Sequence, residues 1–196
     1  MQHAEQGSRR PWFRPEHKGF TSFKTTAPIV FTERWARDVL IQATLDPDVL
    51  SIEPGPAYCQ SRTGVVLAFG QRTTTSLTLI ILSSSVTEDV APPSGYDAAT
   101  ILSRFSILGS TALLTSRMIW SKRSLKVPPS LAVQISARAR TPLTLRRLAA
   151  LTPANEAAVF DSVLAMTCSG YLDLFWHPVL SDSTVVRLRR HWASST

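Results

Sequence analysis

The sequence predicts an α/β protein of two units, a mixed-sheet unit followed by a smaller unit of helices and strands (α+β). Before residue 128, apolar patterns of helical and of strand-like spacing alternate along the chain. Two adjacent prolines, Pro128-Pro129, then break any helix and mark a boundary. Beyond them, helical patterns precede two strand-like runs. The 196 residues, 44% of them hydrophobic, suffice for one large or two small globular domains.

Residues 1–28 are polar and rich in Gly, Pro, Arg and His, so we expect an extended arm that docks through Trp12 and Phe13. A first helix follows, because apolar side chains recur at helical spacing from Phe31 to Leu40. Thr32 can cap its start, and Asp46-Pro47 ends it.

Short apolar runs broken by Pro54-Gly55-Pro56 and Thr63-Gly64 predict strands next, joined by tight turns. The expected strands cover 49–52, 57–60, 65–69 and 76–83. The last of these is apolar on both faces, so we expect it to be central and covered by helices on each side.

A loop at 91–95 precedes an expected helix over 96–105 and a short strand over 110–114 that leads into 117–120. In the second unit, the patterns predict helices over 130–138, 145–151 and 156–169, then strands over 171–176 and 184–189. Three helices followed by a hairpin predict a winged helix over 128–196. Because roughly 65 residues make a marginal core, we expect it to pack on the first unit.

The net charge of +7 is concentrated in the middle of the chain. Nine basic residues and no acid lie between Arg104 and Arg147, whereas six acids face two arginines between Asp46 and Asp97. A cluster of this size, rich in arginine, is typical of a surface that neutralises phosphates, so nucleic acid is the expected partner. The alternative is a solvated basic face that aids solubility. The expected DNA-binding residues are Lys24, Arg117, Lys122, Arg123, Lys126, Arg138, Arg140, Arg146 and Arg147.

No apolar run approaches the ~20 residues needed to cross a bilayer, so we expect a soluble cytoplasmic chain with no membrane partner. Cys59 and Cys168 are far apart and lack a Cys-x-x-Cys spacing, which indicates buried thiols rather than a disulfide framework or a zinc site.

Four short segments carry a resemblance to a known family. They read Gly-Phe-Thr-Ser-Phe-Lys at 19–24, Val-Phe-Thr-Glu-Arg-Trp-Ala-Arg-Asp-Val-Leu at 30–40, Leu-Asp-Pro-Asp-Val at 45–49 and Glu-Pro-Gly-Pro at 53–56. In order and spacing they resemble the TnsA-type transposon endonucleases. The resemblance implies a restriction-endonuclease-like nuclease fold over 29–127, followed by the winged helix. It also implies DNA and other subunits, of transposase or ATPase type, as partners.

Nucleases of that kind hold Mg²⁺ between carboxylates, and a nearby lysine orients the nucleophile. The resemblance places Thr32 and Ala36 where glutamates belong, and Ser83 and Ser84 where the catalytic lysine would lie. No Asp or Glu occurs between Pro54 and Thr87. We therefore expect no catalytic residue, no metal and no cofactor. The weak candidates for a carboxylate site are Glu33, Asp38 and Glu53.

Three functions remain open. The leading hypothesis is a catalytically inactive, TnsA-like DNA-binding or assembly subunit of a mobile-element or DNA-processing complex. The first alternative is a Mg²⁺-dependent endonuclease with displaced ligands, which requires at least two of Glu33, Asp38, Glu53 and Glu88 to converge on one ion.

The second alternative is a winged-helix regulator or protein-interaction adaptor that uses the α/β unit for docking. The third helix of the winged helix, 156–169, contains Glu156 and Asp161 but no Lys or Arg. DNA contacts are therefore expected from the arginines before it, and that helix is a candidate to bind a protein.

Overall fold

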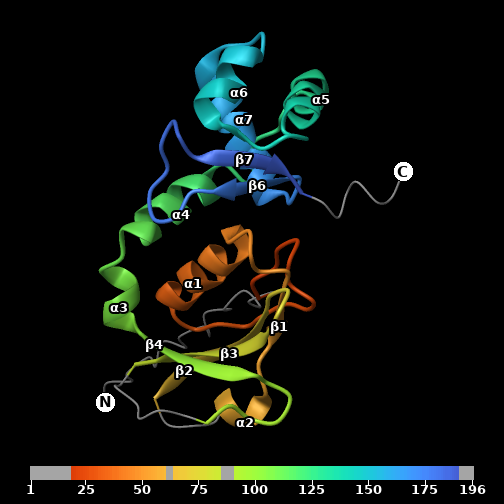
Figure 1. Cartoon of the computed structure of the whole chain (residues 1–196). Helices are drawn as coiled ribbons and strands as arrows, with labels where there is room; N and C mark the ends of the chain where they lie inside the picture. The colour runs from red at the N-terminus through yellow and green to blue at the C-terminus, as the bar shows by residue number, and fades with distance from the viewer. Residues whose placement is uncertain (1–18, 61–63, 85–90, 190–196) are drawn as a thin grey trace, which may run out of the picture.

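The computed structural model describes residues 19–60, 64–84 and 91–189. Its fold is mixed α/β, with a four-stranded mixed sheet in the N-terminal unit and a three-stranded antiparallel sheet in the C-terminal unit (Figure 1). We use N-terminal unit for residues 29–127 and C-terminal unit for the described residues from 128 onward. Trp12 and Phe13, the predicted anchors of the arm, lie outside the described residues.

The larger sheet has the strand order β1 (Ser51–Pro54), β2 (Val65–Arg72), β3 (Leu77–Ser83), β4 (Ala98–Ser103). The pairs β1–β2 and β2–β3 are antiparallel, and β3–β4 is parallel. Ile80 of β3 therefore lies between Phe69 of β2 and Thr100 of β4. β3 is an inner strand with buried side chains on both faces, as its sequence predicts.

Helix α1 (Arg34–Leu45) covers one face of this sheet, where Phe69 and Ile80 join its buried side chains in one core. The helix ends where predicted because Pro47 cannot continue it. On the opposite face, Leu79 and Ile81 form a smaller cluster with Cys59 of the short helix α2 (Ala57–Gln60). This segment is helical, so the strand predicted over 57–60 is wrong.

Two further predicted elements have the wrong type. The segment 96–105, predicted as a helix, contains β4, which pairs along the length of β3; the Asp97 carboxylate accepts a 2.7 Å hydrogen bond from the Leu77 backbone N–H where the pairing begins. The predicted strand 110–114 is the start of a helix. Helices α3 (Arg104–Leu108) and α4 (Thr111–Ser121) are capped by Ser103 and Ser110, whose hydroxyls accept hydrogen bonds from first-turn N–H groups.

The C-terminal unit contains α5 (Pro129–Arg138), β5 (Leu143–Thr144), α6 (Leu145–Leu151), α7 (Glu156–Cys168), β6 (Leu172–Phe175) and β7 (Val185–Leu188). Its three helices and last two strands are confirmed to within a few residues. The two-residue strand β5 was not predicted, and it pairs with β7 in the sheet order β5-β7-β6. Thr144 caps α6 and Gly170, at φ +81°, follows α7, as the sequence indicates.

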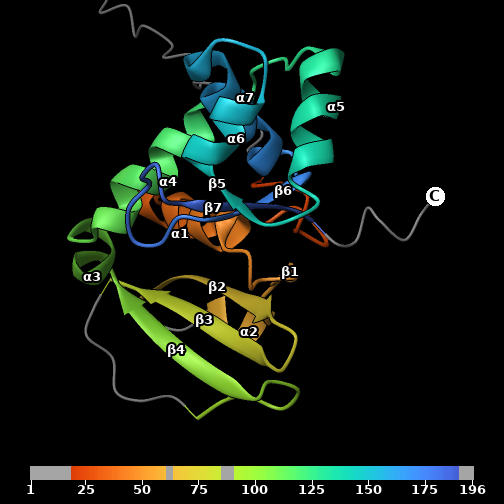
Figure 2. The ribbon, with the colours of Figure 1, turned by 45° about the horizontal axis from the view of Figure 1, so that its top comes forward.

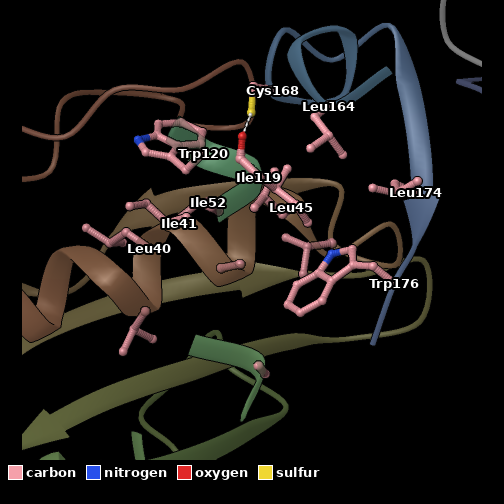
Figure 3. Close-up of a cluster of buried hydrophobic side chains, with 14 of the residues drawn as sticks. Leu40, Ile41, Leu45, Ile52, Ile119, Trp120, Leu164, Cys168, Leu174 and Trp176 are labelled. Atoms are coloured by element: carbon pink, nitrogen blue, oxygen red, sulfur yellow. Dashed lines mark hydrogen bonds between the residues drawn. The ribbon is translucent and has the colours of Figure 1, made fainter. Parts of the chain in front are cut away.

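The two units share one hydrophobic core, because α4 lies between α1 and α7 (Figures 1 and 2). Figure 3 shows Ile119 and Trp120 of α4 between side chains of α1 and of α7. The Cys168 thiol of α7 donates a 3.3 Å hydrogen bond to the Ile119 carbonyl, and Phe20 stacks on Trp120 with ring centroids 5.7 Å apart. Across the described ranges, no helix is long and apolar enough to span a membrane.

Candidate functional site

Three of the four positions that the resemblance marks as degenerate lie at one end of the larger sheet. They are Thr32, Ser83 and Ser84. Thr32 precedes α1 and Ser84 follows β3, and both line an open pocket of about 550 Å³ together with Glu33 and Arg104. Ala36 is fully buried in α1. The buried hydroxyl of Ser83 donates to the Gly64 carbonyl at 3.1 Å. The pocket therefore offers hydroxyls, one exposed carboxylate and one guanidinium.

The three candidate carboxylates point to three different places. Glu33 lines the pocket just described. Asp38 is buried against α4, where it pairs with Arg117. Glu53 pairs in register with Gly70, and a Cβ placed on Gly70 would meet the Glu53 side chain at 2.6 Å. Gly70 in turn pairs with Leu79, so Glu53 lies on the sheet face that α1 does not cover.

These acids therefore do not surround a common point. In the chain from residue 19 to 189, leaving out 61–63 and 85–90, no group of three or more His, Cys, Asp or Glu side chains is placed to hold a metal ion. Glu88, the fourth acid of the displaced-ligand alternative, lies outside the described residues.

Arg117 and Asp38 form a two-point contact between α4 and α1. The Arg117 Nε and Nη2 atoms donate to the two Asp38 carboxylate oxygens at 3.1 and 2.6 Å. This bond raises the pKa of Arg117. The Arg117 side chain is still 49% exposed, whereas that of Asp38 is 10% exposed. The sequence predicts Arg117 as a DNA contact, but in the fold its guanidinium neutralises the buried Asp38 carboxylate.

Lys24 is buried, contrary to its prediction as a DNA contact. Its side chain is 3% exposed and its ammonium donates to the Asp46 carbonyl at the end of α1. Burial, and next the charge of Arg189, lower the pKa of Lys24 to about 7. A phosphate cannot reach this ammonium, so Lys24 belongs to the interior and not to a DNA-binding surface.

The other predicted cations form two groups. The engaged group contacts neighbouring side chains or carbonyls, and the unengaged group forms no side-chain hydrogen bond or ion pair with the described residues. Lys122 donates to the Asp161 carboxylate at 2.8 Å, the Arg123 guanidinium lies 5.8 Å from the Trp120 ring centre, and Arg138 donates to the Gln134 carbonyl. The unengaged group is exposed on the C-terminal unit and the segment that leads into it. It consists of Lys126, Arg140, Arg146 and Arg147.

Helix α7 does not present a free face of the kind that enters a DNA groove. Only its first turn, Glu156 to Ala158, is exposed. The rest is enclosed by α5, α6 and α4, and on the α4 side by the Asp161–Lys122 and Cys168–Ile119 contacts. The same enclosure leaves only the first turn, with Glu156, for the contact with a partner protein that the sequence predicts, because Asp161 already pairs with Lys122.

Sequence analysis missed a cavity of about 600 Å³ between α1, the sheet face and the end of β6. Its walls are mostly apolar and include Trp176. The polar residues that line it are Gln42, Asp46, Asp48, Gln71 and His177. The buried Gln42 Nε2 atom lacks a hydrogen-bond partner among the described residues. No sequence signal indicates this cavity, since its walls come from segments more than a hundred residues apart.

No protein-family model, curated protein or solved structure matches this chain significantly.

Proposed function

We propose that the chain is a noncatalytic DNA-binding or assembly subunit, with a TnsA-like, restriction-endonuclease-like sheet unit and a winged-helix unit. The winged-helix assignment is supported by the element order helix, strand, helix, helix, strand, strand and by the sheet order β5-β7-β6. The nuclease-like assignment is supported by the element order α1-β1-α2-β2-β3, by the parallel β3–β4 pair and by the pocket that Thr32 and Ser84 both line.

The observation that carries the proposal is the surplus of unneutralised cations. Of the nine basic residues between Arg104 and Arg147, only Arg117 and Lys122 form ion pairs within the described ranges. The other seven keep their charge in a stretch without a single acid. DNA phosphates are the polyanion that such a surface fits, and arginine binds them through two N–H groups at once.

This geometry favours binding that depends little on DNA sequence. Sequence is read from base edges, usually by a helix that enters the major groove. Because α7 is enclosed, the contacts left are those of exposed arginines with the phosphate backbone. We therefore propose Lys126, Arg140, Arg146 and Arg147 as the main phosphate contacts.

A DNA titration at several salt concentrations tests this proposal. We expect the full chain to bind a fluorescent duplex with a strong salt dependence, and Arg140→Ala/Arg146→Ala/Arg147→Ala to reduce the slope of log K against log salt by about 0.9 for each lost contact. The matched control is Arg34→Ala/Arg37→Ala/Arg72→Ala, which removes the same charge from the N-terminal unit. Equal losses in both variants, or no binding at physiological salt, would contradict the proposal.

The noncatalytic half of the proposal has its own test. Plasmid DNA incubated with the chain and Mg²⁺ or Mn²⁺ should remain uncut at protein concentrations that saturate binding. Nicking that disappears in Glu33→Gln or Glu53→Gln would instead support the endonuclease with displaced ligands.

A further inference from the structure

Apolar side chains line the outward faces of α3 and α4. Leu114 and Met118, one turn apart on α4, are 69% and 43% exposed, and Phe105 and Leu108 on α3 are 89% and 44% exposed. The two helices follow one another along one side of the molecule (Figure 1), joined by Gly109 and Ser110. We call these four residues the α3–α4 stripe. Two exposed apolar pairs on consecutive helices mark a candidate interaction site.

The fold holds the part of the stripe on α4 in a fixed position. On its inner face, Ile119 and Trp120 are buried in the shared core. Arg117 ties the same helix to Asp38 of α1, and Ser110 caps its start. The exposure of Leu114 and Met118 is therefore a property of a packed helix and not of a loose segment.

The charge around the stripe selects its partner. Arg104 is exposed beside Phe105, and Arg117, which stands between Leu114 and Met118 in the sequence, keeps a 49% exposed side chain although it also pairs with Asp38. The chain contains no acid between Asp97 and Glu156, so α3 and α4 carry no carboxylate of their own. A second copy of the chain would bring these cations together, which is unfavourable. Duplex DNA offers phosphates but no apolar surface for Phe105 or Leu114.

We propose that the α3–α4 stripe is a docking site for an acidic amphipathic helix of a partner protein. Apolar side chains of such a helix at spacings of three and four residues would cover Leu114 and Met118. Its flanking carboxylates would face Arg104 and the exposed side of Arg117. This inference rests on the assembly role in the proposed function, but it uses different residues from the DNA surface.

Two synthetic helical peptides test the proposal. Both carry Leu and Phe along one face over about five turns, one with Glu and one with Lys at the flanking positions. We expect the Glu peptide to bind the full chain at least about tenfold more tightly than the Lys peptide in a fluorescence anisotropy titration. Leu114→Ser/Met118→Ser should weaken this binding about tenfold or more.

The matched control is Val133→Ser, which removes an equally exposed apolar side chain from α5. Equal binding of the two peptides, or no effect of Leu114→Ser/Met118→Ser, would overturn the proposal. So would a dimer in sedimentation velocity, or binding to vesicles of anionic lipid, that this double variant abolishes, because the stripe would then serve a second copy or a membrane.

DNA titrations of the same variants separate this inference from the proposed function. Leu114→Ser/Met118→Ser should bind duplex DNA like the unmodified chain, and Arg140→Ala/Arg146→Ala/Arg147→Ala should bind the Glu peptide unchanged. Loss of peptide binding with intact DNA binding would be the expected result for the stripe variant alone. Circular dichroism and thermal unfolding confirm that each variant is folded.

Discussion

Arg117 of α4 donates two hydrogen bonds to the Asp38 carboxylate of α1, and the shorter of them is 2.6 Å long. This contact connects α1, which covers the larger sheet, to α4, which packs against the C-terminal unit. The Asp38 carboxylate is largely buried, so the protein needs the Arg117 guanidinium to compensate its charge.

Replacement of Arg117 by Ala should therefore destabilise the protein by about 1 to 2 kcal/mol, because it leaves the Asp38 carboxylate buried and unpaired. The half-exposed position of Arg117 keeps the loss below that of a fully buried pair. Urea unfolding measures the change. Arg72→Ala, which removes an exposed arginine, should stay within about 0.5 kcal/mol of the parent. An equal loss in both variants would contradict a specific role for the pair.

Lys24 predicts a pH dependence of stability. Its pKa in the folded chain is about 7, below the ordinary value of 10.5. Between these values the unfolded chain holds a proton that the folded chain has released, so the free energy of unfolding should rise with pH across this range. Below pH 7 both states are protonated at Lys24 and this contribution to the slope vanishes.

Lys24→Met should abolish that contribution, and the stability of the unmodified chain relative to the variant should increase as the pH is raised above about 7. Urea unfolding at several pH values gives the comparison. Lys126→Met, at an exposed lysine, serves as the control and should leave the slope unchanged. Parallel pH profiles for the parent and Lys24→Met would show that Lys24 keeps its ordinary pKa.

The cysteine thiols should be unreactive in the folded protein. Burial raises the pKa of Cys168 to about 12, and its thiol donates to the Ile119 carbonyl, while Cys59 is buried under the sheet. Because the thiolate is the nucleophile, a thiol reagent at neutral pH should modify both only after denaturant is added. Ser124→Cys, at an exposed position, should react at once and provides the positive control.

Gly170→Ala should destabilise the fold through two separable effects. Gly170 has φ +81°, and a Cβ there would lie 2.7 Å from the Phe23 ring. Gly95 also has a positive φ, +91°, but open space around its Cβ position. Gly95→Ala should therefore cost about 1 kcal/mol from backbone strain, and Gly170→Ala at least about 2 kcal/mol. Equal losses in urea unfolding would show that the Phe23 ring moves aside freely.

The sequence predicted correctly those helices whose bounds depend on apolar spacing, capping residues, proline or glycine within the segment itself. The apolar spacing from Trp35 to Leu40 and the proline at 47 define α1, although the helix begins after Glu33 and not at the Thr32 cap that the sequence indicates. Thr144 marks the start of α6, and Gly170 follows the end of α7. The two exchanged assignments have different causes, one tertiary and one local. Ala98 to Ser103 is extended because it completes the backbone hydrogen bonds of β3, which its own composition does not demand. Ser110 was a cap signal for α4 that the strand-like run 110–114 obscured.

For the proposed DNA-binding surface, the sequence predicts where basic residues concentrate but not which of them are free to bind. The acid-free stretch from Arg104 to Arg147 is visible in the sequence, and most of its cations are exposed. Which of them are free is a property of the fold, because Asp38 and Asp161 reach Arg117 and Lys122 across 79 and 39 residues. The surroundings of Lys24 are likewise set by the fold, because its ammonium donates to the Asp46 carbonyl and feels the charges of Asp173 and Arg189, which are distant in the sequence.

Because α4 packs in both halves of the core, the two units depend on each other for stability. A cut between Pro128 and Pro129 would expose Ile119 on the N-terminal fragment and Cys168 on the C-terminal fragment. Neither fragment would then keep a complete hydrophobic core. Replacement of one half by an unrelated domain would leave on the retained half an apolar surface that the new domain is not shaped to cover.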